Sequence, residues 1–295
     1  MFSYIKPTRL CFSGGGIKTI SYIGALEALQ EANLLISIRE YLGVSAGAFV
    51  AFCLAIGYSL TELRHIMNET DFGEIRSIDP DKLFEYDVHF GIDDGEGLIN
   101  LISRLLTHKG LSANMCFGDL NSSVILRIFA TDLSELAPRE FSRKLTPGVK
   151  LVDALRASMA LPLYFTPVRD PITGNLLTDG GVIANYPIIH LTPFEANSTI
   201  GFIFDDHVNN QRDITDLLGY LYQIMSCFWI NESIATYSRY AKNTIIIPCS
   251  SYKSWNFEVT MSDKEILVAA GKKAAILYLE TLKKGGNILR RRSVS

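Results

Sequence analysis

The sequence lacks features that are typical of several protein classes, and each absence argues against one class. No run reaches the roughly 18 uninterrupted apolar residues of a membrane-spanning helix. The net charge of −3 over 295 residues is too small to favour nucleic acid as a partner. The five cysteines are scattered and have no zinc-ligand spacing, so we expect free thiols and no metal site. Because no apolar signal segment with a cleavage site opens the chain, we expect a cytoplasmic protein, in some settings peripheral at membranes.

Strand and helix patterns alternate along the first part of the chain. The apolar spacing predicts a strand over residues 9–12, a helix over 19–31, a strand over 36–42 and a helix over 48–56. Residues 71–114 contain no strong strand pattern, and we interpret them as a helical excursion from the sheet. Alternating βα units predict an α/β fold, in which a central, mostly parallel sheet is flanked by helices.

The rest of the chain continues the pattern without a repeat or a low-complexity linker. We therefore expect one catalytic domain over residues 1–284 and a basic, disordered tail over 285–295. The further predicted strands are 124–131, 198–204 and 244–248, and the further predicted helices are 153–160, 214–237 and 263–283.

A nucleophile elbow is predicted at Ser45. Gly43-Val44-Ser45-Ala46-Gly47 matches G-x-S-x-G, in which small residues are needed two positions before and after the serine because the turn from strand to helix is very tight. A predicted strand precedes the motif and a predicted helix follows it, as an elbow requires. The alternative is an ordinary glycine-flanked turn.

Three consecutive glycines, Gly14, Gly15 and Gly16, separate the predicted strand 9–12 from the helix that follows. Their backbone N–H groups can face an anion. A Rossmann fingerprint would need glycine in place of Thr19, and a P-loop would need serine or threonine directly after a Gly-Lys pair. An oxyanion hole beside the Ser45 turn fits better, with a flexible loop as the alternative.

Asp179 precedes Gly180 and Gly181, a pattern that by itself is typical of a turn and only secondarily of a catalytic carboxylate. Together with the two glycine-rich motifs, however, this segment resembles the patatin-like phospholipase family. Four motifs carry the resemblance in the family's order: the glycine loop 14–18, the elbow 43–47, A-S-M-A-L-P-L-Y-F-T-P at 157–167 and D-G-G-V-I-A-N-Y-P at 179–187. The resemblance covers residues 9–187 and becomes loose beyond them.

The resemblance implies a three-layer α/β/α fold and the hydrolysis of fatty acyl esters, with lipid at a membrane or micelle surface as the substrate. It implies that Ser45 is the nucleophile, that Asp179 is the base of a Ser–Asp dyad, and that Gly14, Gly15 and Gly16 form the oxyanion hole. No cofactor and no metal is required. Lys18 is expected to stabilise the glycine loop or attract an anionic head group, with a solvated surface lysine as the alternative.

A dyad makes a physical demand on Asp179. A serine hydroxyl needs a neighbouring base, and an aspartate with its ordinary pKa of about 3.9 is a weak one, so burial would have to raise that pKa. Two other functions stay open. An α/β-hydrolase esterase would use a triad of Ser45, Asp179 and His207, and a non-catalytic relative would bind lipid or a partner protein. The intact Ser45, Asp179 and glycine loop argue against the non-catalytic relative.

Overall fold

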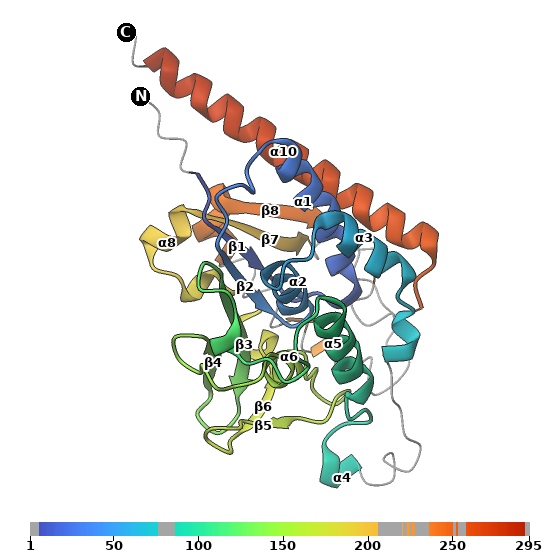
Figure 1. Cartoon of the computed structure of the whole chain (residues 1–295). Coiled ribbons are helices and arrows are strands. Elements are labelled where there is room, and N and C mark those ends of the chain that lie inside the picture. The colour runs from blue at the N-terminus through green and yellow to red at the C-terminus, as the bar shows by residue number, and fades with distance from the viewer. Residues whose placement is uncertain are drawn as a thin grey trace.

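A computed structural model describes residues 6–75, 86–205, 220, 223–224, 226–227, 236–249, 252 and 258–292. Its centre is an eight-stranded sheet in the order β5-β6-β3-β2-β1-β7-β8, with β4 also paired to β3 (Figure 1). The strands are β1 (Arg9–Phe12), β2 (Glu40–Val44), β3 (Ile125–Asp132), β4 (Ala137–Ser142), β5 (Val168–Arg169), β6 (Leu176–Asp179), β7 (Thr199–Asp205) and β8 (Thr244–Pro248).

Helices connect the strands. The α-helices are α1 (Ser21–Glu31), α2 (Ala46–Ala55), α3 (Leu60–Glu69), α4 (Tyr86–His89), α5 (Glu96–His108), α6 (Leu151–Ser158), α7 (Gly181–Ala184), α8 (Pro193–Asn197) and α10 (Met261–Arg292). The short 3-10 helices are η1 (Gly16–Ile20), η2 (Phe72–Ile75), η4 (Phe117–Asp119), η5 (Pro187–His190) and η6 (Ala241–Asn243). The excursion predicted over residues 71–114 contains η2, α4 and α5, and its described residues between and after these helices are irregular.

The predicted fold class is confirmed. β3, β2, β1, β7 and β8 are parallel neighbours, whereas β4, β5 and β6 add antiparallel pairs that the sequence patterns did not predict. Strand β4 is short of apolar residues and contains Pro138, which a strand tolerates at a sheet edge but not at its centre. Its alternation was therefore too weak to be recognised as a strand.

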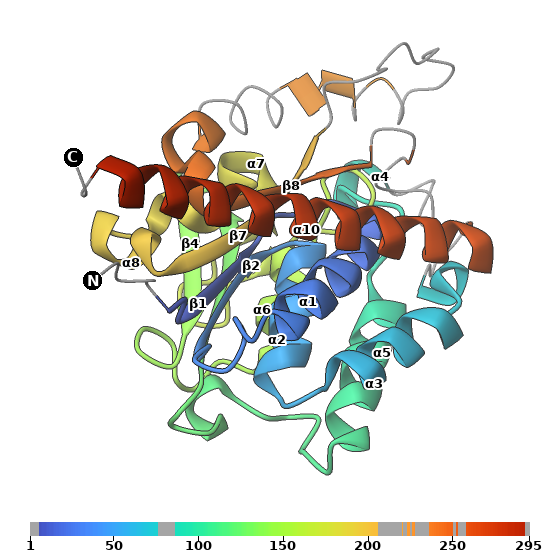
Figure 2. The same cartoon turned by 90° about the horizontal axis from the view of Figure 1, so that it is seen from above.

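The two faces of the sheet carry hydrophobic clusters of different size. The larger cluster joins alternate residues of β1, β3 and β7 to α1, α2, α3, α5, α6 and α10. The smaller cluster joins the opposite residues of the same strands to Tyr186 and to η5 and α8. Figure 2 shows these layers from above, with α10 lying across the helical side. The side-chain period of two thus divides each strand between two cores.

Helix α10 is held on the larger face by backbone contact with α1. A Cβ atom at Gly24 of α1 would collide with the carbonyl of Val268, and one at Gly271 of α10 would collide with the carbonyl of Ser21. Glycine is required at both positions because the two helix backbones approach too closely for any side chain.

Helix α10 extends into the segment for which a tail was expected. The helix is assigned through Arg292, and the division into a domain over residues 1–284 and a disordered tail over 285–295 stays a prediction. Gly285-Gly286 suggested the break, because each glycine costs about 1 kcal/mol relative to alanine inside a helix. Lysine, leucine and arginine, which favour helix, surround the two glycines, and the helix passes through them.

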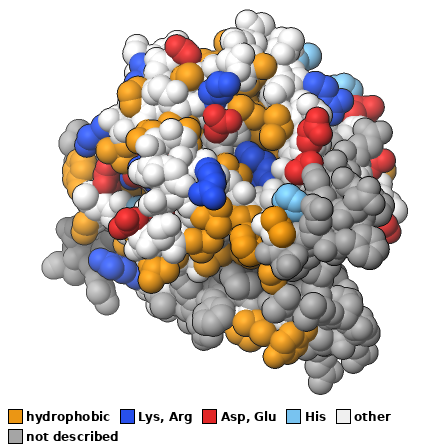
Figure 3. Space-filling model, turned by 90° about the horizontal axis from the view of Figure 1, so that it is seen from below, with side chains coloured by type: hydrophobic (Ala, Val, Ile, Leu, Met, Phe, Trp, Pro, Cys, Tyr) orange, Lys and Arg blue, Asp and Glu red, His pale blue; other side chains and the backbone are white. Residues whose placement is uncertain are grey.

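Apolar side chains also reach the surface. Among the described residues, Leu136 and Phe194 are the most exposed large hydrophobic side chains, with 80% and 83% of their surface accessible. Figure 3 shows that hydrophobic side chains gather on the lower face of the molecule, with individual basic side chains between them.

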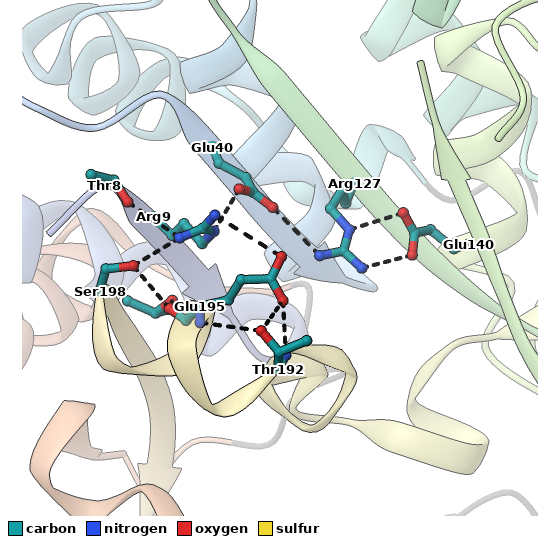
Figure 4. Close-up of polar contacts among 9 residues, drawn as sticks. Thr8, Arg9, Glu40, Arg127, Glu140, Thr192, Glu195 and Ser198 are labelled. Carbon is teal, nitrogen blue, oxygen red and sulfur yellow. Dashed lines mark hydrogen bonds and ion pairs between the residues drawn. The ribbon is translucent and has the colours of Figure 1, made fainter. Parts of the chain in front are cut away.

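A row of charged side chains crosses the sheet face that carries the smaller cluster, near the N-terminal ends of the parallel strands (Figure 4). Glu40, at the start of β2, accepts a hydrogen bond from Arg9 at 2.6 Å and one from Arg127 at 3.4 Å. Arg127 also binds Glu140 through two nitrogens, at 2.9 and 2.7 Å. Burial alone would lower the pKa of Arg127, but its bonds to Glu140 and the charge of Glu40 outweigh burial and raise it. Glu40 is buried, and the partly exposed guanidinium groups of Arg9 and Arg127 supply its counter-charge.

Candidate active site

Ser45 occupies the turn between β2 and α2. Its φ of 53° and ψ of −134° place it in a backbone conformation that side chains rarely adopt. A Cβ atom at Gly43 would collide with Ala48, and one at Gly47 would collide with the carbonyl of Ser13. The strand, turn and helix predicted around the G-x-S-x-G motif are therefore confirmed, and sterics explain both glycines.

Asp179 reaches Ser45 through the pairing of β3. Val44, the last residue of β2, pairs with Phe129, and Asp179, the last residue of β6, pairs with the next residue, Ala130. Strand β4 pairs with Phe129 and Ala130 along one edge of β3. Strands β2 and β6 therefore both pair along the opposite edge, where β6 begins its pairing at the residue after the last partner of β2. The two strands run in opposite directions, so their C-terminal ends meet.

The two side chains are hydrogen-bonded where the strands meet. The hydroxyl of Ser45 donates to Oδ2 of Asp179 at 2.6 Å, and the backbone N–H of Gly181 donates to Oδ1 at 2.8 Å. Among the residues described, no lysine or arginine forms an ion pair with this carboxyl group. Within the described residues, the carboxyl group of Asp179 is thus hydrogen-bonded to one hydroxyl and one backbone amide.

Burial governs the acidity of Asp179. The side chain is 3% exposed, and burial raises its pKa to about 6, although the hydrogen bonds from Ser45 and Gly181 act in the opposite direction. A carboxyl group with this pKa is ionised at neutral pH and binds a proton far more readily than an exposed aspartate. It has the properties of a general base working near neutrality.

The glycine loop lies directly against Ser45. A Cβ atom at Gly14 would stand 3.1 Å from the Cβ of Ser45 and would overlap the amide oxygen of Asn185. Asn185 holds Gly14 at both ends, since the N–H of Gly14 donates to the Asn185 carbonyl at 3.1 Å and the Asn185 side chain donates to the Gly14 carbonyl at 3.3 Å. The N–H of Gly14 is therefore already used.

The amides of Gly15 and Gly16 differ from that of Gly14. Within the described part of the chain, neither N–H donates to a backbone or side-chain acceptor. The aromatic ring of Phe204 fills the space that a side chain at position 15 would need, and Gly16 has a φ of 54°. The loop thus presents two N–H donors, with no space for a side chain at position 15 and a left-handed backbone that favours glycine at position 16.

Lys18 follows this loop in η1 and is buried, with 3% of its surface exposed. Its ammonium nitrogen lies 5.7 Å from the centre of the Phe204 ring, and its carbonyl accepts the hydroxyl of Ser21 at 2.7 Å. The reading of Lys18 as a solvated surface lysine is therefore wrong. Its contact with Phe204, the ring that packs on Gly15, is consistent with support of the glycine loop.

Ser158 and Asn185 contact the site, although the sequence assigned neither of them this role. The hydroxyl of Ser158 accepts the backbone N–H of Ser45 at 2.9 Å. Asn185 holds Gly14 through both its side-chain amide and its backbone carbonyl. Ser158 belongs to the motif at 157–167 and Asn185 to the motif at 179–187. The motifs therefore drew attention to both residues but did not say which groups their side chains would contact.

No histidine among the described residues is hydrogen-bonded to Ser45 or Asp179: the hydroxyl of Tyr58 is bonded to His108, and His190 stacks on Phe129. His207, the third member of the alternative triad, lies outside the described residues. The part of the chain that the structure describes also contains no group of three His, Cys, Asp or Glu side chains placed to bind a metal ion.

None of the described helices is long and apolar enough to span a membrane.

The chain is similar to known proteins in sequence and in fold. The family model described as Patatin-like phospholipase matches residues 10–192, a range that contains all four motifs. The chain is 30% identical over 290 residues to Uncharacterized protein YqhO of Bacillus subtilis (strain 168), which covers 91% of this chain and 97% of that protein. It is 26% identical over 192 residues to Probable lipid hydrolase 463L of Invertebrate iridescent virus 6, covering 62% of this chain and 64% of that protein.

Among solved structures, the fold is similar to the crystal structure of VipD from Legionella pneumophila. The TM-score is 0.60 at 17% sequence identity, and the match covers 94% of this chain and 67% of that chain. At this identity the likeness concerns the fold alone.

Proposed function

The chain belongs to the patatin-like phospholipase family, and from that premise we propose that it is a serine lipid acyl hydrolase with Ser45 as nucleophile and Asp179 as base. Membership of the family confirms the resemblance found in the four motifs and supports lipid hydrolysis in general. The observation that carries the finer proposal is the 2.6 Å hydrogen bond from the hydroxyl of Ser45 to Oδ2 of Asp179.

Acylation begins with this hydrogen bond. Oγ of Ser45 attacks the carbonyl carbon of a fatty acyl ester while its proton passes to Oδ2 of Asp179. The pKa of Asp179, which burial raises to about 6, makes the carboxylate a stronger base than an exposed aspartate. The tetrahedral intermediate then expels the alcohol half of the lipid, which takes the proton from Asp179, and the acyl group remains on Ser45.

Charge on the carbonyl oxygen is stabilised by the glycine loop. The N–H groups of Gly15 and Gly16 are the proposed donors, because that of Gly14 is engaged by Asn185. Gly14 instead brings the loop against Ser45, with no side chain between them. One oxyanion donor is typically worth about 10²–10³ in rate.

Deacylation repeats the same chemistry with water. Asp179 accepts a proton from a water molecule as its oxygen attacks the acyl carbon, and the same amides stabilise the second oxyanion. Collapse of this intermediate breaks the bond to Ser45, whose oxygen recovers the proton from Asp179, and releases the fatty acid. The cycle uses only side chains and amides of this chain, and we expect it to run without metal or cofactor.

The substrate is proposed to be a phospholipid or a related acyl lipid at a membrane or micelle surface. Support comes from the family and from the lower face, where hydrophobic side chains lie beside basic ones (Figure 3). Apolar side chains can enter the acyl region of such a surface while cations meet its phosphates.

A fluorophosphonate probe tests the proposal. We expect the probe to label the wild-type protein at one site, Ser45. The labelled protein should no longer hydrolyse a mixed lipid extract, which is measured by mass spectrometry of the released fatty acids. Ser45→Ala should be neither labelled nor active, whereas Ser123→Ala, at an exposed serine before β3, should behave as wild type. Hydrolysis of a soluble ester should be unchanged by a chelator. Labelling elsewhere, or full activity of Ser45→Ala, would refute the proposal.

A further inference from the structure

Ser158 connects the two halves of the candidate site through a hydroxyl that is inaccessible to solvent. It is the last residue of α6 and is 0% exposed. Its Oγ accepts the backbone N–H of Ser45 at 2.9 Å and donates its own proton to the carbonyl of Phe129 at 2.6 Å. One hydroxyl therefore bridges the nucleophile's backbone to the neighbouring strand.

The position of this bridge in the sheet is informative. Val44 pairs with Phe129 in the parallel ladder of β2 and β3, so the N–H of Ser45 and the carbonyl of Phe129 stand where one more ladder bond would form. The hydroxyl of Ser158 is inserted between these two groups and satisfies both. The chain can then leave β2 at Ser45 without losing a buried hydrogen bond.

The backbone around Ser158 also holds the carboxylate. Its carbonyl accepts the N–H of Gly180 at 3.3 Å, and the carbonyl of Ala160 accepts the N–H of Asp179 at 2.9 Å. A Cβ atom at Gly180 would collide with the Phe129 carbonyl, the same group that receives the Ser158 hydroxyl. The end of α6 thus contacts both partners of the Ser45–Asp179 hydrogen bond.

We propose that Ser158 is a positioning residue, whose hydroxyl keeps Ser45 in its elbow conformation by replacing a direct ladder bond to Phe129. This inference rests on the proposed function of Ser45 and Asp179. Without the hydroxyl, the N–H of Ser45 either stays buried without a partner or closes onto the Phe129 carbonyl. Either outcome moves Oγ away from Oδ2 of Asp179, and a displacement of about 1 Å can cost about 10²-fold in rate.

The central variant is Ser158→Ala, compared with wild type on a soluble ester. We expect kcat to fall by about 10²-fold and KM to change by less than about threefold, because Ser158 positions the nucleophile and does not contact the substrate. Ser158→Thr, which keeps the hydroxyl, should recover activity to within about tenfold of wild type. Ser142→Ala removes a buried serine hydroxyl from β4, away from the site, and should leave kcat unchanged.

Two further measurements separate positioning from a purely structural effect. The rate at which a fluorophosphonate labels Ser45 should fall in parallel with kcat in Ser158→Ala, since both depend on the same hydroxyl. The acid limb of the pH profile should also move to higher pH, because the hydrogen bond from Ser45 lowers the pKa of Asp179 and its loss removes that effect. Circular dichroism and thermal unfolding establish that each variant is folded.

The outcomes are distinct. A folded Ser158→Ala with wild-type kcat and labelling rate would overturn the positioning role while the proposed function stands. Should Ser158→Ala fail to fold, Ser158→Cys, which has nearly the same shape but a weak hydrogen-bonding group, takes its place, with the same expected loss and the same overturning result. Absence of both labelling and hydrolysis in wild-type protein would instead refute the proposed function and this inference with it.

Discussion

The two ends of strand β2 place buried carboxyl groups in opposite electrostatic surroundings. At its start, Glu40 is 6% exposed and lies between the guanidinium groups of Arg9 and Arg127. At its end, Ser45 donates to Asp179, which is 3% exposed and has no ion-pair partner within the described residues. The comparison teaches that burial is unfavourable for a charged group unless counter-charges lie beside it. An unpaired carboxyl group keeps its affinity for a proton, which a general base needs.

The largest expected effect tests the catalytic end. Asp179→Asn should reduce kcat by about 10³-fold or more, because an amide cannot accept the proton of Ser45. Its shape and its bond from Gly181 can be retained, so the protein should stay folded. His207→Ala is the matched variant and should keep near-normal kcat on a soluble ester. If His207→Ala is as inactive as Ser45→Ala while folded, a triad replaces the dyad.

The opposite substitution tests the structural end. Glu40→Gln removes a buried acceptor charge between two partly exposed guanidinium groups and should lower the free energy of unfolding by about 3 kcal/mol, as measured by chemical denaturation at pH 7. The kcat of the folded protein should stay within about twofold of wild type, since Glu40 lies at the far end of β2. Unchanged stability would show that the row of charges in Figure 4 contributes little.

A smaller stability change of opposite sign is expected for Asp179→Asn. Since the pKa of Asp179 is raised to about 6 in the folded protein, the folded state binds its proton more tightly than the unfolded chain does. The free energy of unfolding therefore falls as pH rises from about 4 to about 6, and the full destabilisation by the buried charge is present above about pH 6. The neutral amide avoids the cost, so the variant should be more stable than wild type by about 2–3 kcal/mol at pH 8.

Thermal or chemical unfolding at two pH values checks this sign. The advantage of Asp179→Asn should shrink as pH falls towards about 4, where the wild-type carboxyl group is protonated in the folded state and about half protonated in the unfolded chain. A variant that is less stable than wild type at pH 8 would contradict an unpaired buried charge at this position.

The smallest expected effect is on the pH dependence of the wild-type rate. With the pKa of Asp179 near 6, kcat/KM should fall about tenfold per unit of pH below that value, as the base becomes protonated. A soluble ester keeps ionisation of a lipid surface out of the measurement. Activity that stays constant down to pH 4 would show that Asp179 is paired in solution, and the contrast with Glu40 would disappear.

Much of the fold could be predicted from local patterns. The bounds predicted for β1 and β8 agree with the structure, and the α/β class follows from apolar spacing that depends only on neighbouring residues. The antiparallel strands β4, β5 and β6 were missed. They are short, and strand β4 carries a proline and several polar residues, so tertiary pairing, not pattern, makes them strands.

The candidate site divides in the same way. The elbow glycines at positions 43 and 47 were predictable, because the tightness of a turn is a local steric matter. Asp179 had the local pattern of a turn, and only its resemblance to a family motif singled it out. The carbonyl of Asn185, 171 residues away, accepts the N–H of Gly14, and neither segment by itself predicts this contact.

By itself the sequence determined where the backbone must turn and where it can expose N–H groups, because glycine spacing acts through sterics over a few residues. Only the tertiary structure decided which groups meet at those turns. Asp179 reaches Ser45 across 134 residues, and Ser158 reaches its backbone across 113, because β2 and β6 end on consecutive rungs of β3 with the end of α6 beside them. The raised pKa of Asp179 has the same origin, since burial belongs to the folded molecule and not to any segment of it.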